Sequence, residues 1–93
     1  MRRRAAKVDA NQAEIVRGLR AFGASVQSLA PMGEGVPDLL CGKNGQTYLL
    51  EVKTAAGKLT ADETQWIDGW RGQVAVVRTL DEALAAIGIL VAQ

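Results

Sequence analysis

The dipeptide Asn44-Gly45, which stands between two short apolar runs, constrains the fold of this chain more than any other feature. Asn-Gly favours the two-residue turns that join antiparallel strands, because both residues adopt positive φ angles at little cost. The run Leu39-Leu40-Cys41 precedes the dipeptide, and the run from Thr47 to Lys53 follows it. The sequence therefore predicts a β-hairpin with a tight turn over residues 43–46.

Helix and strand signals flank this hairpin on both sides. Asp9, with Gln12 three residues later, is typical of a helix N-cap, and apolar residues then recur at helical spacing until Gly23. Thr60 and Glu63 repeat the capping pattern. The expected elements are a helix from Asp9 to Gly23, strands over 25–30, 39–41 and 47–53, a helix from Thr60 to about Arg71, a strand over 73–78 and a helix over 81–87.

Length and composition narrow the class of protein. Ninety-three residues, 48% of them hydrophobic, suffice for one globular domain with a mixed α/β sheet, which we expect over residues 9–93. Histidine is absent and Cys41 is the single cysteine, so a disulfide within the chain is excluded, and a reducing, cytoplasmic setting is expected. No apolar run approaches the roughly 20 residues that cross a bilayer, and neither a signal peptide nor a membrane partner is expected.

The first residues form a basic arm, although the formal net charge of the chain is only +1. Such an arm, over residues 1–8, suits contacts with nucleic-acid phosphates, while a solvated, frayed terminus explains it equally well. The residues of interest for phosphate contact are Arg2, Arg3, Arg4, Lys7 and, further along the chain, Lys58.

Two acids and a lysine occupy the open end of the predicted hairpin. Pro37-Asp38 precedes its first strand, and Glu51-Val52-Lys53 ends its second strand, thirteen residues from Asp38 to Glu51. Side chains alternate along a strand, so Glu51 and Lys53 share one face. Two carboxylates and the Val52 carbonyl supply hard oxygen ligands for Mg²⁺ or Mn²⁺, and an ammonium beside them suits phosphodiester hydrolysis. Taken singly, an acid-x-Lys triplet is more often a solvated strand edge.

The segments Gly35-Val36-Pro37-Asp38 and Glu51-Val52-Lys53, followed by Leu59 and Gln65, resemble the PD-(D/E)XK nucleases and, within them, the virus-type replication-repair (VRR-NUC) branch. The resemblance runs from about Asp9 to Ile87 and implies a restriction-endonuclease-like αβββαβ core. It implies that Asp38, Glu51 and the Val52 carbonyl bind the metal and that Lys53 is the catalytic lysine.

The same resemblance implies roles for two helical residues. Gln65 matches a glutamine that lies near the active site in that family, and Glu14 occupies the place of an acid on the first helix that reaches the metal or its waters. Both have simpler explanations as surface residues. Trp66 and Trp70, one helical turn apart, are expected either in the core or on a dimer surface.

The function expected from this resemblance is a structure-specific endodeoxyribonuclease, acting as a homodimer on Holliday junctions or other branched DNA. No small-molecule cofactor is expected, and a bacterial or phage origin fits a compact, stand-alone form. Two alternatives stay open: a nickase or flap-type nuclease that needs a targeting partner, and a DNA-binding module that keeps the fold without catalysis.

Overall fold

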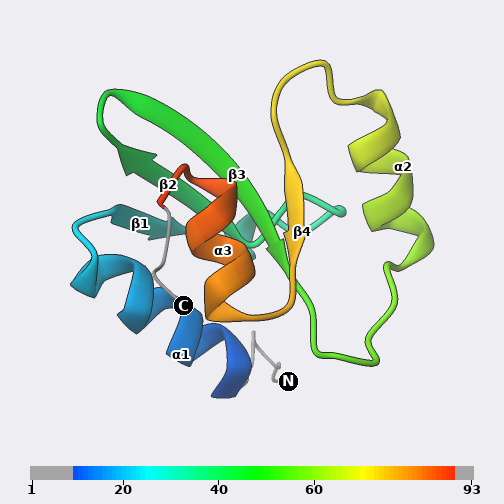
Figure 1. The fold of residues 1–93 in the computed structure, drawn as a ribbon. Coiled ribbons are helices and arrows are strands. Elements are labelled where there is room, and N and C mark those ends of the chain that lie inside the picture. Colours follow the sequence, from blue (N-terminus) through cyan, green and yellow to red (C-terminus); the bar gives the residue numbers. More distant parts are fainter. Residues whose placement is uncertain (1–9, 90–93) are drawn as a thin grey trace.

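The computed structural model of the protein describes residues 10–89 (Figure 1). Helices and strands follow the order expected from the sequence, with one additional 3₁₀ turn, so the chain is an α+β protein with a mixed sheet. The elements are α1 (Ala10–Ala21), β1 (Ser25–Ser28), η1 (Ala30–Met32), β2 (Leu39–Lys43), β3 (Gln46–Val52), α2 (Ala61–Gly69), β4 (Ala75–Val77) and α3 (Leu80–Ala86).

The four strands form one sheet in the order β1-β2-β3-β4. The first three strands pair antiparallel, and β4 joins β3 in parallel. Asn44 and Gly45 alone form the turn between β2 and β3, with φ angles of 53° and 79°. Positive φ at both residues is the type I′ geometry that matches the twist of a hairpin, so the Asn-Gly prediction is confirmed.

The core lies between one face of this sheet and the helices α1 and α3, which pack against each other (Figure 1). Alternate residues of β2 and β3 point into this core, and the largest of them are Leu39 and Leu50. Ile15 and Leu19 from α1 and Leu84 from α3 close the core from the other side. The same alternation leaves Glu51 on the opposite face of the sheet.

Helix α2 stands apart from this core, beyond β4 in Figure 1, and none of its residues is fully buried. Trp66 and Trp70 stack on each other with ring centroids 4.6 Å apart, and Trp70 remains 43% exposed. The expectation that the two indoles pack in the core is therefore wrong. The stacking arises because i and i+4 residues share one side of a helix.

Several element boundaries differ from the expected ones, and β2 extends to Lys43. Local contacts account for the differences in β1 and β4. β1 ends at Ser28, because the next residues turn into η1 with Pro31 in its first turn. α2 ends at Gly69 rather than near Arg71. β4 covers only Ala75–Val77, since the side-chain amide of Gln73, rather than its backbone, pairs with the peptide of Leu49: Leu49 N donates to Oε1 at 2.6 Å and Nε2 donates to Leu49 O at 3.2 Å. Within residues 10–89, no helix is long and apolar enough to span a membrane.

Candidate active site

The hairpin register brings Asp38 and Glu51 together. Leu39 is paired with Leu50 in the last step of the β2–β3 ladder, so Asp38 and Glu51 are opposite each other one residue further along. The backbone amide of Val52 donates a hydrogen bond to Asp38 Oδ2 at 2.9 Å. Asp38 also lies within hydrogen-bonding contact of the Glu51 carboxyl. A two-residue turn thus determines which two acids meet at the open end of the hairpin.

Among the described residues, Glu51 is the only charged residue that is buried, with 2% of its surface exposed. Burial, together with the negative charges of Asp38 and Glu63, raises its pKa to about 8. Burial also raises the pKa of Asp38. When Glu51 is protonated, it can donate a hydrogen bond to Asp38 or to Glu63. Two adjacent carboxyls in a water-poor setting cannot both ionise cheaply, which is the electrostatic condition that a bound cation relieves.

Lys53 follows β3 and lies on the same face as Glu51. Its ammonium Nζ is 3.7 Å from Glu51 Oε2 and 2.7 Å from Glu63 Oε1. Burial lowers the pKa of Lys53, but the hydrogen bond to Glu63 and the three surrounding carboxylates outweigh it, so the pKa is raised. Lys53 therefore stays cationic beside the acids.

Glu63 completes this arrangement from α2, and we call Asp38, Glu51, Lys53 and Glu63 the acid–lysine cluster. Oε1 of Glu63 accepts the backbone N–H of Thr60 at 2.8 Å, while Thr60 Oγ1 accepts the backbone N–H of Glu63 at 3.1 Å. This is the capping box predicted from the sequence. Burial raises the pKa of Glu63, yet the hydrogen bonds from Lys53 and Thr60 outweigh it and lower the pKa. Sequence reasoning assigned Glu63 only the capping role.

The backbone carbonyl of Val52 can serve as a third ligand for a cation. Lys53 N donates to Val77 O at 3.0 Å, so the peptide groups of Lys53 face β4. Peptide groups of neighbouring strand residues face opposite edges, which directs both the N–H and the C=O of Val52 toward Asp38. Among residues 10–89, no group of three or more His, Cys, Asp or Glu side chains is arranged to hold a metal ion. A cation at this place would be held by two carboxylates, one carbonyl and water.

The two helical residues proposed from the resemblance, Gln65 and Glu14, are both exposed. Gln65 is exposed on α2 and lines a shallow pocket of about 250 Å³ with Glu34, Asp62 and Trp66. Glu14 is exposed on α1, and no described hydrogen bond or ion pair joins it to the acid–lysine cluster. The structure thus brings Asp38, Glu51 and Lys53 together and adds Glu63, whereas the roles of Gln65 and Glu14 stay predictions.

The basic residues proposed to contact DNA are only partly described. Lys58 is exposed in the loop between β3 and α2. Arg2, Arg3, Arg4 and Lys7 lie outside the described residues, as does the proposed N-cap Asp9.

Two polar side chains, those of Asn11 and Arg78, bind backbone carbonyls at Lys53 and in the segment that follows it. Asn11, in the first turn of α1, donates to the carbonyl of Lys53 at 2.9 Å and to that of Arg78 at 3.4 Å. The guanidinium of Arg78 donates to the carbonyls of Thr54 and, at 2.7 Å, of Gly57. The segment that follows Lys53 is therefore tied to both α1 and β4.

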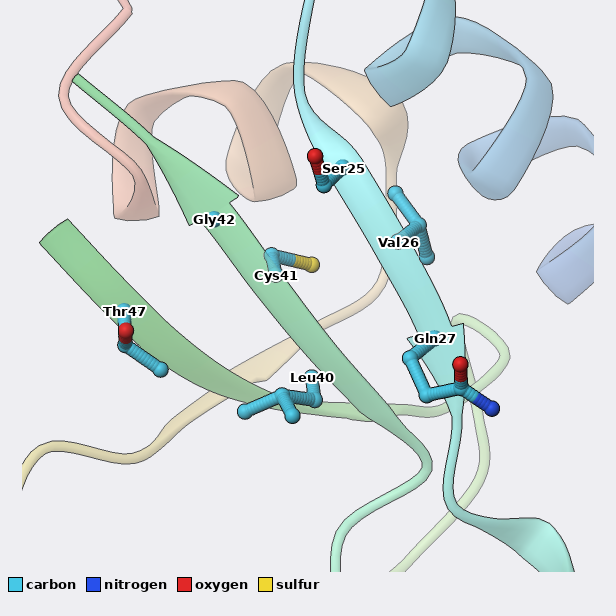
Figure 2. A pocket seen from close by; sticks show the side chains of 7 residues that line it. All are labelled: Ser25, Val26, Gln27, Leu40, Cys41, Gly42 and Thr47. Carbon is cyan, nitrogen blue, oxygen red and sulfur yellow. The ribbon is translucent and has the colours of Figure 1, made fainter. Parts of the chain in front are cut away.

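A groove of about 300 Å³ crosses β1, β2 and β3 near the turn of the hairpin (Figure 2). Its lining carries no charged side chain: Ser25, Val26, Gln27, Leu40, Cys41, Gly42 and Thr47. Figure 2 shows the sulfur of Cys41 directed toward Val26. Burial raises the pKa of this thiol to about 11, so it stays protonated and unreactive near neutral pH. The acid–lysine cluster is the better candidate for chemistry.

In comparisons of the chain with family models, curated proteins and solved structures, none matches it.

Proposed function

We propose that this protein is a metal-dependent endodeoxyribonuclease of the PD-(D/E)XK type that acts on branched DNA. One observation carries the proposal. Asp38 and Glu51 are in contact at the open end of the hairpin, and Glu51 is buried to 2% exposure with the Lys53 ammonium 3.7 Å away. A solvated strand edge, the simpler explanation of an acid-x-Lys triplet, does not bury its acid.

The donor set fits a hard divalent cation. Asp38, Glu51 and the Val52 carbonyl would hold Mg²⁺ or Mn²⁺, both of which prefer oxygen ligands and retain several waters. When bound, such an ion supplies polarisation of a phosphoryl oxygen and lowers the pKa of a coordinated water. Binding requires Glu51 to give up the proton that burial favours, so the site takes up its cation with release of a proton below about pH 8.

The residues of the chain would divide the remaining work. Asp38 is fixed by the Val52 amide, so one of its oxygens is already oriented before any ligand arrives. Lys53 stays protonated and can donate a hydrogen bond to an oxygen of the scissile phosphate, where negative charge increases in the transition state. Such preoriented donors lower the barrier because they need little reorganisation during the reaction.

A four-way junction is the substrate that we propose first, and a homodimer is the form that would cut it. One chain offers one acid–lysine cluster, whereas paired cuts in a symmetric junction need two clusters related by a two-fold axis. A nickase or flap-type nuclease uses the same chemistry with one cut. Light scattering at micromolar concentration, with and without junction DNA, is expected to give two chains per particle, and a monomer in both conditions would remove the main support for junction resolution.

Cleavage assays test the activity directly. The purified protein is incubated with a labelled four-way junction, a linear duplex, a flap and a single strand, in Mg²⁺, Mn²⁺ or EDTA. D38N and K53M proteins run beside D68N, which neutralises an exposed acid of α2 and serves as the matched control. We expect metal-dependent cuts by the wild-type and D68N proteins and loss of at least about 100-fold in the other two.

The pattern of cuts separates the candidate functions. Paired cuts in the junction support resolution, and single cuts in the flap or duplex support the nickase alternative. If no substrate is cut in either metal, the enzymatic proposal fails, and a DNA-binding module becomes the better account of the fold.

A further inference from the structure

One oxygen of Glu63 contacts both the start of α2 and the lysine that follows β3. Oε1 accepts the Thr60 backbone N–H at 2.8 Å and contacts the Lys53 ammonium at 2.7 Å. Lys53 Nζ is a full ångström further from Glu51 Oε2, at 3.7 Å. The ammonium is therefore bound to the acid of α2 and only approaches the acid of β3.

We infer that Glu63 is a positioning residue that holds Lys53 away from Glu51, so that the Asp38–Glu51 pair remains available to a divalent cation. This inference rests on the nuclease function proposed above. The role differs from that of a metal ligand, because the oxygen of Glu63 that faces the site is already shared between Lys53 and the Thr60 amide.

Charge balance explains why such a holder is needed. Glu51 is the most buried acid of the acid–lysine cluster, with 3% of its side-chain surface exposed, compared with 18% for Glu63. A cation is attracted most strongly to the least solvated carboxylate, since water screens it least. Without a competing acid, the flexible Lys53 side chain would close the distance to the ionised Glu51 and occupy the oxygen that a metal needs. Glu63 supplies that competing acid.

The backbone N–H of Thr60 fixes the position of the Glu63 carboxylate. Glu63 Oε1, the oxygen that contacts Lys53, accepts the backbone N–H of Thr60 and is thereby tied to the N-cap of α2. The bond from the Glu63 backbone N–H to Thr60 Oγ1 completes the capping box without touching the carboxylate. Gly35 lies directly against the first turn of α2: a Cβ on it would come within 3.1 Å of the Glu63 nitrogen and overlap the Asp62 carbonyl. The loop that leads to Asp38 and the helix that carries Glu63 are therefore packed together.

A double-mutant cycle tests the inference through the affinity for Mn²⁺ alone, measured by calorimetry without DNA. In the wild-type background, E63Q is expected to weaken Mn²⁺ binding about tenfold, because Lys53 then pairs with Glu51. In the K53M background, E63Q is expected to change the affinity less than about twofold, since no ammonium is left to hold. An equal loss in both backgrounds would mean that Glu63 acts on the metal directly, and it would overturn the inference.

T60V is the matched control for the structural role of Glu63. It removes the hydroxyl that accepts the Glu63 N–H but keeps the Glu63–Lys53 contact. We expect a lower melting temperature with Mn²⁺ affinity within about twofold of the wild type. If T60V weakened binding as much as E63Q does, the effect of E63Q would be a loss of helix capping, and the inference would be wrong.

A crystal structure of the metal-free E63Q protein gives a readout that does not depend on the proposed function. The expected change is that Lys53 Nζ moves from 3.7 Å to hydrogen-bonding contact with Glu51. If the wild-type protein binds no Mn²⁺ but the lysine moves in this way, the proposed function fails and the holding role stands. If the wild-type protein binds Mn²⁺ and the lysine in E63Q stays where it is, the holding role alone fails.

Discussion

The backbone amide of Val52 is bonded to the side chain of Asp38 at 2.9 Å, so the last residue of β3 fixes the acid that precedes β2. The bond extends the hairpin pairing by one step beyond Leu39, the first residue of β2. It also leaves the Val52 carbonyl directed to the same side. The carboxylates of Asp38 and Glu51 and the carbonyl of Val52 therefore lie together at the end of β3.

Replacing Asp38 by Asn separates this structural bond from the charge. The Asn carbonyl oxygen can still accept the Val52 N–H, while the negative charge next to Glu51 is lost. We expect D38N to fold with unchanged or slightly higher stability in EDTA at pH 8 and to lose Mn²⁺ binding by about 100-fold or more. Thermal denaturation and calorimetric titration measure the two effects. Retention of wild-type Mn²⁺ affinity by D38N would exclude Asp38 as a metal ligand.

The stability of the metal-free protein is expected to fall as the pH rises from about 5 to 8. The pKa of Glu51 is raised from the ordinary 4.5 to about 8 in the folded chain, so the folded state binds more protons than the unfolded state across this window. One such proton gives a slope of at most about 1.4 kcal/mol per pH unit. Asp38 contributes with the same sign, and the lowered pKa of Glu63 opposes it only at more acidic pH.

Chemical denaturation in EDTA at half-unit pH steps measures this slope. E51Q is expected to flatten it, because the amide cannot ionise. E14Q, at an exposed acid on α1, is the control and should keep the wild-type slope. A wild-type protein whose stability rises between pH 5 and 8 would show that Glu51 ionises freely in the folded state.

The sequence predicts the centre of this site better than its edge. Asn44-Gly45 fixes a two-residue turn, and the turn fixes the register that brings Asp38 opposite Glu51. These relations are local, so the pattern of residues suffices. Contacts of α2 depend on long connections that no periodicity specifies.

Glu63 was missed because its capping role already accounted for it. A signal was present: Glu63, Trp66, Ile67 and Trp70 recur at the spacing of one helix face, and Gln65 lies on another. Glu63 contacts Lys53, whereas Gln65 is exposed. The role that the resemblance implies for Gln65 stays a prediction.

Gly35 is expected to control the position of α2 relative to the acid–lysine cluster. Its φ is +82°, and an added methyl group would overlap the Asp62 carbonyl. Gly33 provides a matched control, because its φ is +64° and a methyl group there would contact nothing within 4 Å. Both alanine variants carry the cost of positive φ, about 1 to 3 kcal/mol, but only G35A adds a steric clash.

The two variants are therefore expected to differ in function more than in fold. G35A should displace the first turn of α2, separate Glu63 from Lys53 and weaken Mn²⁺ binding several-fold, while G33A should bind as the wild type does. Denaturation curves and calorimetry on both proteins make the comparison. Equal Mn²⁺ affinities in G35A and G33A would show that the contact between the loop and α2 does not support the cluster.

Arg78 is expected to stabilise the segment after Lys53 through geometry rather than charge. Its guanidinium bonds the carbonyls of Thr54 and Gly57 at once, and a lysine at this position carries the same charge without the planar set of donors. R78K should lower the free energy of unfolding by about 1 to 2 kcal/mol and increase amide hydrogen exchange over residues 54–58. R71K, at an exposed arginine after α2, is the control and should change neither quantity. If R78K left exchange in this loop unchanged, the loop would owe its order to other contacts, such as that of Asn11 with the Lys53 carbonyl.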